Sequence, residues 1–245
     1  MLGRQQRGFT LVEIAIVLVI IGLLLGGILK GQEMITQAKI KNVIGDFSGI
    51  SAAFYGYQDR YRQLPGDDAC AGGTLTSAQQ AVCGATTGRW GTNTTAGSGN
   101  GIVTGYYNSQ TDGDETRLWW QHLRLAGFVS GQGQIQPFNT YAGYIGAQTG
   151  DGGDGSATTT TRKPALGTDA AGAGGMPGII ICSANLPDTV ALATDTQMDD
   201  GVRLSGTVRA TPAQTSPNPA IPANGASGTS YDQTGSNLYT VCRSL

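Results

Sequence analysis

The sequence has little charge and almost no histidine. Charged residues make up 13% of the chain, aromatic residues 7%, and His122 is the single histidine. After residue 63 acidic groups outnumber basic ones, and no basic stripe is present, so nucleic-acid binding by this part of the chain is not expected. One histidine and four cysteines without a CxxC pair argue against a zinc site.

The sequence also lacks the short motifs of common enzymes. It has no phosphate-binding loop, no GxSxG and no HExxH. His122 lies beside Trp119 and Trp120, without the signature of a Ser or Cys nucleophile near it. We therefore predict that the protein is not an enzyme and that His122 is structural.

What the sequence does have is a long apolar run close to its first residue. From Phe9 to Leu29 it reads FTLVEIAIVLVIIGLLLGGIL, after a short polar segment with Arg4 and Arg7. A helix needs about 20 apolar residues to cross a bilayer. The run is longer than the apolar core of a secretory signal peptide, and no small-x-small cleavage site follows it. The pattern predicts a membrane-spanning helix over residues 9–30.

One carboxylate, Glu13, interrupts the apolar run. A carboxylate in hydrocarbon costs about 2–4 kcal/mol, so an intramembrane acid is by default a functional residue with a partner. The alternative is that Glu13 lies at the level of the lipid headgroups and reaches water.

Beyond the apolar run, hydrophobic residues recur at the spacing of one face of an amphipathic helix. Pro65 and Gly66 end the pattern. A helix from Phe9 to Arg62 would be about 80 Å long at 1.5 Å per residue, which is more than one small domain spans. We therefore expect residues 31–64 to pack on a globular head. The expected apolar face consists of Ile35, Ala38, Ile40, Ile44, Phe47, Ile50, Phe54, Tyr57 and Tyr61.

The rest of the chain, residues 65–245, reads as a head with short elements and long loops rich in Gly, Ser and Thr. We expect helices at 112–127, with Asp112 as N-cap, and at 187–200. We expect strands at 134–148, 176–184, 202–208 and 237–243, and loops at 66–111, 149–175 and 211–236.

The four cysteines form an even set in a chain with an export signal, which predicts two disulfides. Four cysteines allow three pairings. Because short loops close most readily, we favour Cys70–Cys83, which leaves Cys182–Cys242.

The N-terminal string RGFTLVEIAIVLVIIGLL resembles the cleavage and methylation signature of type IV prepilins, with Gly8, Phe9 and Glu13 at the signature's positions. The resemblance implies that a prepilin peptidase cuts after Gly8 and methylates the new amine of Phe9. It also implies that Glu13 pairs with the N-terminal amine of a neighbouring subunit during assembly.

Three later segments are similar to a bacterial pilin-like group: DRYRQLPGD at 59–67, WQHLRLAG at 120–127 and DDG at 199–201. This similarity implies a pilin-like α+β fold, in which a long N-terminal helix packs on a small antiparallel sheet. The expected organisation is a leader (1–8), a membrane or filament-core helix (9–30), an amphipathic helix (31–64) and the head (65–245).

The resemblance implies a structural subunit: a pilin, a minor pilin or a pseudopilin. Its expected partners are other filament subunits, the prepilin peptidase and the inner membrane. The head would face the periplasm before the subunit joins a filament. The alternative is a tip or adhesive subunit that binds a surface ligand or DNA through loops 149–175 and 211–236.

Two further features leave alternatives open. Asp199 and Asp200 could offer oxygens to calcium, or they could serve only as turn residues; we expect no cofactor. Many major pilins have a proline within the N-terminal helix. Here residues 22–31 contain glycines instead, which either permit local melting or allow close helix packing.

Overall fold

The computed structural model describes residues 10–150, 164–168, 172–214, 222 and 228–245. Contacts divide the chain into two compact units, Met1–Ile40 and Lys41–Leu245. This division falls later than the predicted end of the membrane segment. Helix α1 contributes to both units, and the second unit contains every other helix and strand of the described chain.

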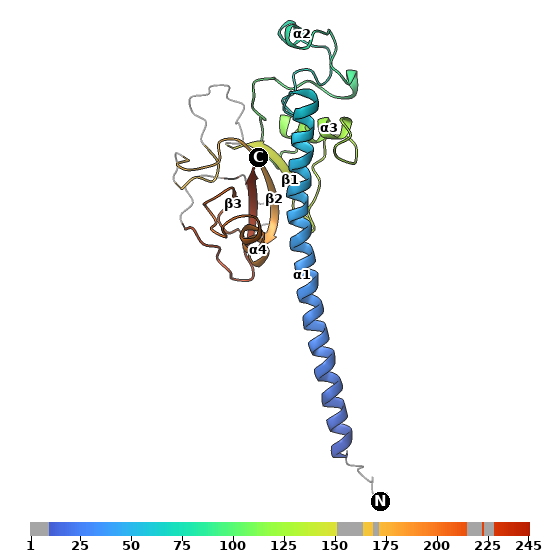
Figure 1. Ribbon diagram of the computed structural model, residues 1–245, viewed down its shortest axis with the longest axis vertical. Helices are drawn as coiled ribbons and strands as arrows, with labels where there is room; N and C mark the ends of the chain where they lie inside the picture. The colour runs from blue at the N-terminus through green and yellow to red at the C-terminus, as the bar shows by residue number, and fades with distance from the viewer. Residues whose placement is uncertain (1–9, 151–163, 169–171, 215–221, 223–227) are drawn as a thin grey trace, which may run out of the picture. The chain divides into compact units, whose positions relative to one another are not determined.

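Helix α1 runs from Leu11 to Tyr61 without interruption (Figure 1). It passes through the glycines between Gly22 and Gly31, so the helix is not melted there in the single subunit. A Cβ atom added at those glycines would have nothing within 4 Å, and they are therefore open to a neighbouring helix. The helix ends before Arg62, which adopts a left-handed conformation with φ of 56°.

The part of α1 that belongs to the second unit is amphipathic, as its pattern predicts. Its buried apolar residues are Val43, Phe47, Ile50, Ala53, Phe54 and Tyr57. Four expected members differ, because Ile35 and Ala38 are exposed and Ile44 and Tyr61 are only partly buried. The ring of Phe54 stacks on Trp119 at 5.3 Å, and burying each large side chain of this kind stabilises the fold by about 1.5–3 kcal/mol.

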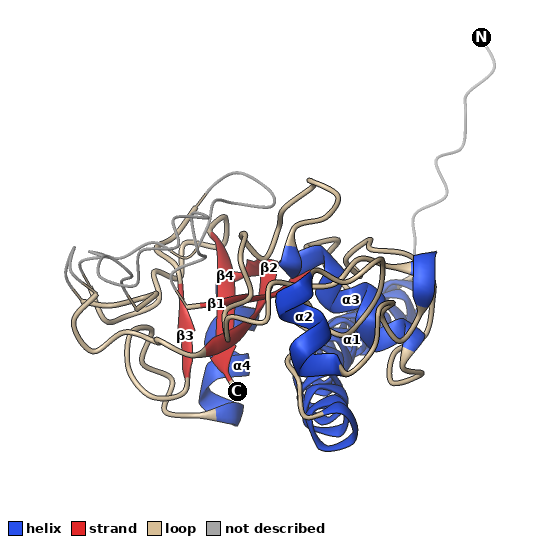
Figure 2. Ribbon diagram, turned by 90° about the horizontal axis from the view of Figure 1, so that it is seen from above, coloured by secondary structure: helices blue, strands red, loops and turns tan. Residues whose placement is uncertain are grey.

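The sheet has four strands in the order β1-β2-β4-β3, all antiparallel (Figure 2). Helix α4 (Asp188–Met198) contacts β2, β3 and β4, and helix α3 (Glu115–Leu125) contacts β1. The predicted α+β class, with a long N-terminal helix and a small antiparallel sheet, is confirmed. The strands are β1 Ile145–Thr149, β2 Ile179–Pro187, β3 Val208–Ala210 and β4 Leu238–Ser244.

Both disulfides have the pairing that the sequence favours. Cys182 lies directly opposite Cys242 in the register of β2 and β4, and the bond belongs to the buried core of the sheet. Cys70–Cys83 closes a short loop outside the sheet. The longer closure therefore fastens the last strand to the centre of the sheet.

The strand predicted at 134–148 was wrong over most of its length, because β1 begins only at Ile145. The side chain of Asn139 builds a turn instead. Its Oδ1 accepts hydrogen bonds from the backbone N–H groups of Tyr141 and Gly143, and its amide donates to the Ala184 carbonyl at 2.7 Å. A Cβ at Gly143 would come within 1.9 Å of that carbonyl oxygen, so this close approach requires glycine.

The strand predicted at 202–208 was also wrong, since β3 covers only Val208–Ala210. Two carboxylates form hydrogen bonds with the backbone of the segment that precedes β3. Asp200 accepts a hydrogen bond from the Val202 N–H, and Asp199 accepts hydrogen bonds from the N–H groups of Thr207 and Val208. These bonds hold the segment as turns.

Helix α3 begins later than predicted, and Asp114 rather than Asp112 is its N-cap residue. The carboxylate of Asp112 instead forms an ion pair with Arg117 at 2.8 Å. Segment 66–111 also contains a short helix, α2 (Ser77–Cys83), that we did not predict. Thr76 and Gln79 form a capping box at its start, and their spacing in the sequence could have revealed it.

Candidate functional site

The start of α1 is organised by Thr10 and Glu13. The Glu13 carboxylate accepts hydrogen bonds from the backbone N–H and the hydroxyl of Thr10, both at 2.8 Å. The Glu13 N–H donates back to the Thr10 hydroxyl at 3.3 Å. This is a capping box, which satisfies N–H groups that have no partner within the helix.

Behind this cap, the first unit displays an apolar surface. The large hydrophobic side chains between Leu11 and Leu29 are all exposed. Within the described residues, one helix is long and apolar enough to cross a membrane, and it is α1. Such a surface is not stable in water, so it requires lipid or other helices around it.

Glu13 is the one charged group among these apolar residues of α1. In the single subunit its hydrogen bonds come from Thr10, a neutral residue of the same chain. Among the described residues, the negative charge therefore has no cation beside it. Gly8 and Phe9, where we predict cleavage and methylation, lie outside the described residues, and both predictions stand as made.

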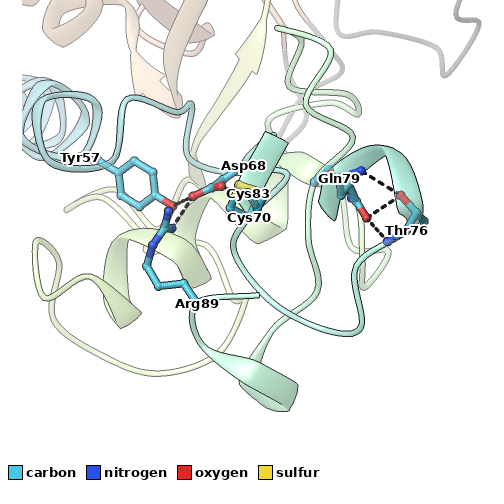
Figure 3. Close-up of a disulfide and its surroundings, with 8 residues drawn as sticks. Tyr57, Asp68, Cys70, Thr76, Gln79, Cys83 and Arg89 are labelled. Carbon is cyan, nitrogen blue, oxygen red and sulfur yellow. Dashed lines mark hydrogen bonds and ion pairs between the residues drawn. A yellow bond between two sulfur atoms is a disulfide. The ribbon is translucent and has the colours of Figure 1, made fainter. Parts of the chain in front are cut away.

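In the second unit, two adjacent buried carboxylates organise the segment after α1. Asp68 accepts hydrogen bonds from the Tyr57 hydroxyl at 2.5 Å and from the Arg89 guanidinium at 2.8 Å (Figure 3). It also accepts the N–H of Cys70 at 2.8 Å. This network ties the end of α1 to the disulfide loop, and Arg89 compensates the buried charge.

Asp67 holds a different loop. Its carboxylate accepts the Ser98 hydroxyl and the backbone N–H groups of Gly99, Asn100 and Gly101, at 2.6–3.0 Å. Asp67, the last residue of the DRYRQLPGD similarity, and Asp68 directly after it therefore organise the fold in this structure. The hydrogen-bond donors of both carboxylates are groups of the same chain.

His122 is completely buried and neutral. Its Nδ1 accepts the N–H of Gly66 at 3.0 Å, and its Nε2 lies 3.1 Å from the carbonyl oxygen of Thr95. Because an amide N–H only donates and a carbonyl only accepts, the ring proton is on Nε2. Burial lowers the pKa of His122 to about 4. The ring serves as a structural link, as the sequence predicts.

Asp199 and Asp200 come together with Asp195, and we call these three residues the acidic cluster. Carboxylate oxygens of the three lie within 4.8 Å of one another. Asp195 also accepts a hydrogen bond from the Tyr231 hydroxyl at 2.6 Å, so one carboxylate of the cluster already has a partner within the chain. Three carboxylates at this spacing could offer oxygens to a divalent cation, and the expectation of no cofactor stays a prediction.

Sequence reasoning missed two residues of these sites. Thr10 stands three residues before Glu13, which is the spacing of a capping box. Asp195 lies in the last turn of α4, four residues before Asp199, which directly follows the helix. Both signals were present in the sequence.

A family model described as the prokaryotic N-terminal methylation motif matches residues 3–29, which is the signature of type IV pilins and pseudopilins. No curated protein and no solved structure matches the chain. The matched range contains the apolar run and Glu13, and it supports a type IV pilin-like or pseudopilin protein with a membrane-anchored precursor.

Proposed function

We propose that this chain is a structural subunit of a bacterial type IV filament, cut after Gly8, methylated at Phe9 and assembled through α1. The observation that carries the proposal is the lone Glu13 charge on an exposed apolar helix, inside the range that the methylation motif matches. Cleavage after Gly8 creates a cationic amine at the start of the same apolar segment. A buried carboxylate and a buried ammonium each gain by finding the other.

We take the hydrogen bonds between Thr10 and Glu13 to be those of the subunit before assembly. In the membrane, the Thr10 hydroxyl and N–H solvate the carboxylate without neutralising it. In the filament, the amine of Phe9 from a neighbouring subunit supplies the missing positive charge. The pair then acts as a register device, because a subunit is stable only at the axial position that satisfies both charges.

The partners follow from this proposal. A prepilin peptidase acts on Gly8–Phe9, the inner membrane holds α1, and other filament subunits replace the lipid during assembly. The head then lies in the periplasm before assembly and on the filament afterwards. The motif points to a structural subunit rather than to an enzyme.

Replacing Glu13 by Gln tests the proposal. The amide can still accept the Thr10 hydrogen bonds, as glutamine does in natural capping boxes, but it carries no charge. Glu33→Gln is the matched control, since Glu33 is an exposed acid of the same helix that pairs with Lys30 at 2.8 Å. We expect Glu13→Gln to be cleaved normally and to yield few sheared filaments, while the control assembles. Normal assembly of Glu13→Gln would refute the pairing role.

A further inference from the structure

Some charged residues of the helix segment in the second unit, Lys41–Tyr61, have a partner within the subunit, and others have none. Asp59 lies 3.7 Å from the guanidinium of Arg62, so this exposed acid has a cation nearby. Asp46 and Lys41 have no hydrogen bond or ion pair with any residue in the described part of the chain. The fourth charged residue of this segment, Arg60, lies over the Tyr61 ring at 5.3 Å from its centroid. Asp46 and Lys41 are therefore the charged residues of Lys41–Tyr61 without a described partner.

Of these two residues, Asp46 carries the larger energetic cost of an unpaired charge, because its side chain is partly buried. It lies between Val43 and Ile50, at helical spacings of three and four, and both of those residues are buried in the core. Burial raises the pKa of Asp46, which shows that the site disfavours its charge. A cation from outside the subunit would relieve that penalty.

Lys41 is exposed on the same helix but cannot supply that cation. Residues five apart are rotated by about 140° around an α-helix, so the two side chains point from opposite flanks. Only residues three or four apart face each other. The helix therefore presents an unpaired acid on one flank and an unpaired base on the other.

We infer that Asp46 of one subunit forms an ion pair with Lys41 of a second copy of this chain, an inference that rests on the proposed function. The two groups are complementary in charge, and each copy offers both. Because Asp46 and Lys41 lie on different flanks of the helix, the ion pair uses a different surface on each of the two copies. Each pair of subunits therefore still offers an unused Lys41 on one copy and an unused Asp46 on the other. A heterologous contact of this kind that also displaces each copy along the helix axis cannot close into a ring, so it propagates into an open filament.

The positions also set the geometry. With parallel helices, Lys41 of the second copy comes level with Asp46 of the first when the second is displaced by about 7.5 Å along the axis, which is five residues at 1.5 Å each. The ion pair is then a second contact, besides that of Glu13, that fixes the axial position of one subunit relative to the next. It acts at the head end of the helix rather than at the membrane end.

Charge reversal tests the inference in the full-length chain expressed in a strain that forms filaments. Asp46→Lys and Lys41→Glu should each lower the yield of sheared filaments about tenfold or more, because a pair of like charges replaces an attractive pair. Combining the two substitutions should restore the yield. Asp59→Lys is the matched control: it has the same change of charge at an exposed site of the same helix, and it should assemble normally.

A disulfide experiment gives an answer even where charge reversal harms the head. The described cysteines are all paired in native disulfides, so new thiols can be followed separately. Oxidised filaments with both Lys41→Cys and Asp46→Cys should give a ladder of covalent multimers, and neither single substitution should. No ladder, or wild-type assembly of both reversed variants, would overturn the inference. Absence of filaments and of leader cleavage in the wild type would instead refute the proposed function.

Discussion

Acid should destabilise the head through His122. The ring is buried, with the Gly66 N–H on one nitrogen and the Thr95 carbonyl on the other. Protonation would place a second N–H against the Gly66 N–H, which can only donate. The charged ring would also lose its hydration, and the folded state therefore resists the proton that the unfolded chain accepts.

The magnitude follows from the difference in pKa between the two states. The pKa of His122 is about 4 in the folded protein, against 6.5 for an ordinary histidine. The free energy of unfolding is unaffected above about pH 6.5, falls as the pH drops toward 4, and is level below that. A difference of about 2.5 units at 1.36 kcal/mol each gives a loss of about 3 kcal/mol at pH 4.

The assay is urea unfolding of the full chain in detergent, followed by tryptophan fluorescence between pH 7 and pH 4. Trp119 and Trp120 are fully buried in the second unit, so their emission reports on the head. Other groups titrate in the same range with the opposite sign. Burial raises the pKa of Asp67 and Asp195, and these acids add stability as the pH falls.

His122→Gln isolates the histidine, since glutamine offers an acceptor and a donor but does not titrate in this range. The variant should be less stable at pH 7, because its amide fits the two partners less well. Between pH 7 and pH 4 the wild type should lose about 3 kcal/mol more than the variant does. Equal losses in the two proteins would refute a neutral, buried His122.

Three other predictions concern the head. Replacing Cys182 and Cys242 by Ser should cost about 4 kcal/mol in urea unfolding, against about 3 for removal of the shorter disulfide; an equal or smaller cost would contradict the role of the longer closure. A fragment that begins at Gly31 should be a folded monomer by circular dichroism and size exclusion. One that begins at Gly66 should aggregate, and its folding as a monomer would show that α1 is not part of the core. Calcium at millimolar concentration should leave the melting temperature unchanged, and a clear rise would identify the acidic cluster as a binding site.

The sequence predicts well the elements whose hydrophobic pattern decides their structure. The apolar run and its amphipathic continuation are long and periodic, and α1 spans them without a break. The run GIIICSA became the central strand β2, because a buried apolar segment of that length pairs on both sides. The disulfide pairing followed from loop length alone.

The prediction failed where a side chain organises the backbone. Asn139 replaces the expected strand by a turn, and Asp199 and Asp200 do the same before β3. Such side-chain hydrogen bonds depend on where the chain returns in space, which periodicity does not record. The same limit applies to Asp67, whose loop partners are more than thirty residues away in the sequence.

The residues that we propose for assembly also differ in what the sequence reveals of them. Glu13 is visible in the sequence because a charge stands out in an apolar run. That Asp46 and Lys41 have no partner among the described residues is visible only in the structure, since either residue alone resembles an ordinary polar position of an amphipathic helix. Their significance comes from burial and from the flank on which each lies.

The most direct test of the account is the intact mass of the subunit in filaments sheared from the native cells. The account predicts a chain that begins at Phe9, carries one added methyl group on its amine and retains both disulfides. A subunit that still begins at Met1 in assembled filaments would contradict cleavage after Gly8, and the function proposed for α1 would fail with it.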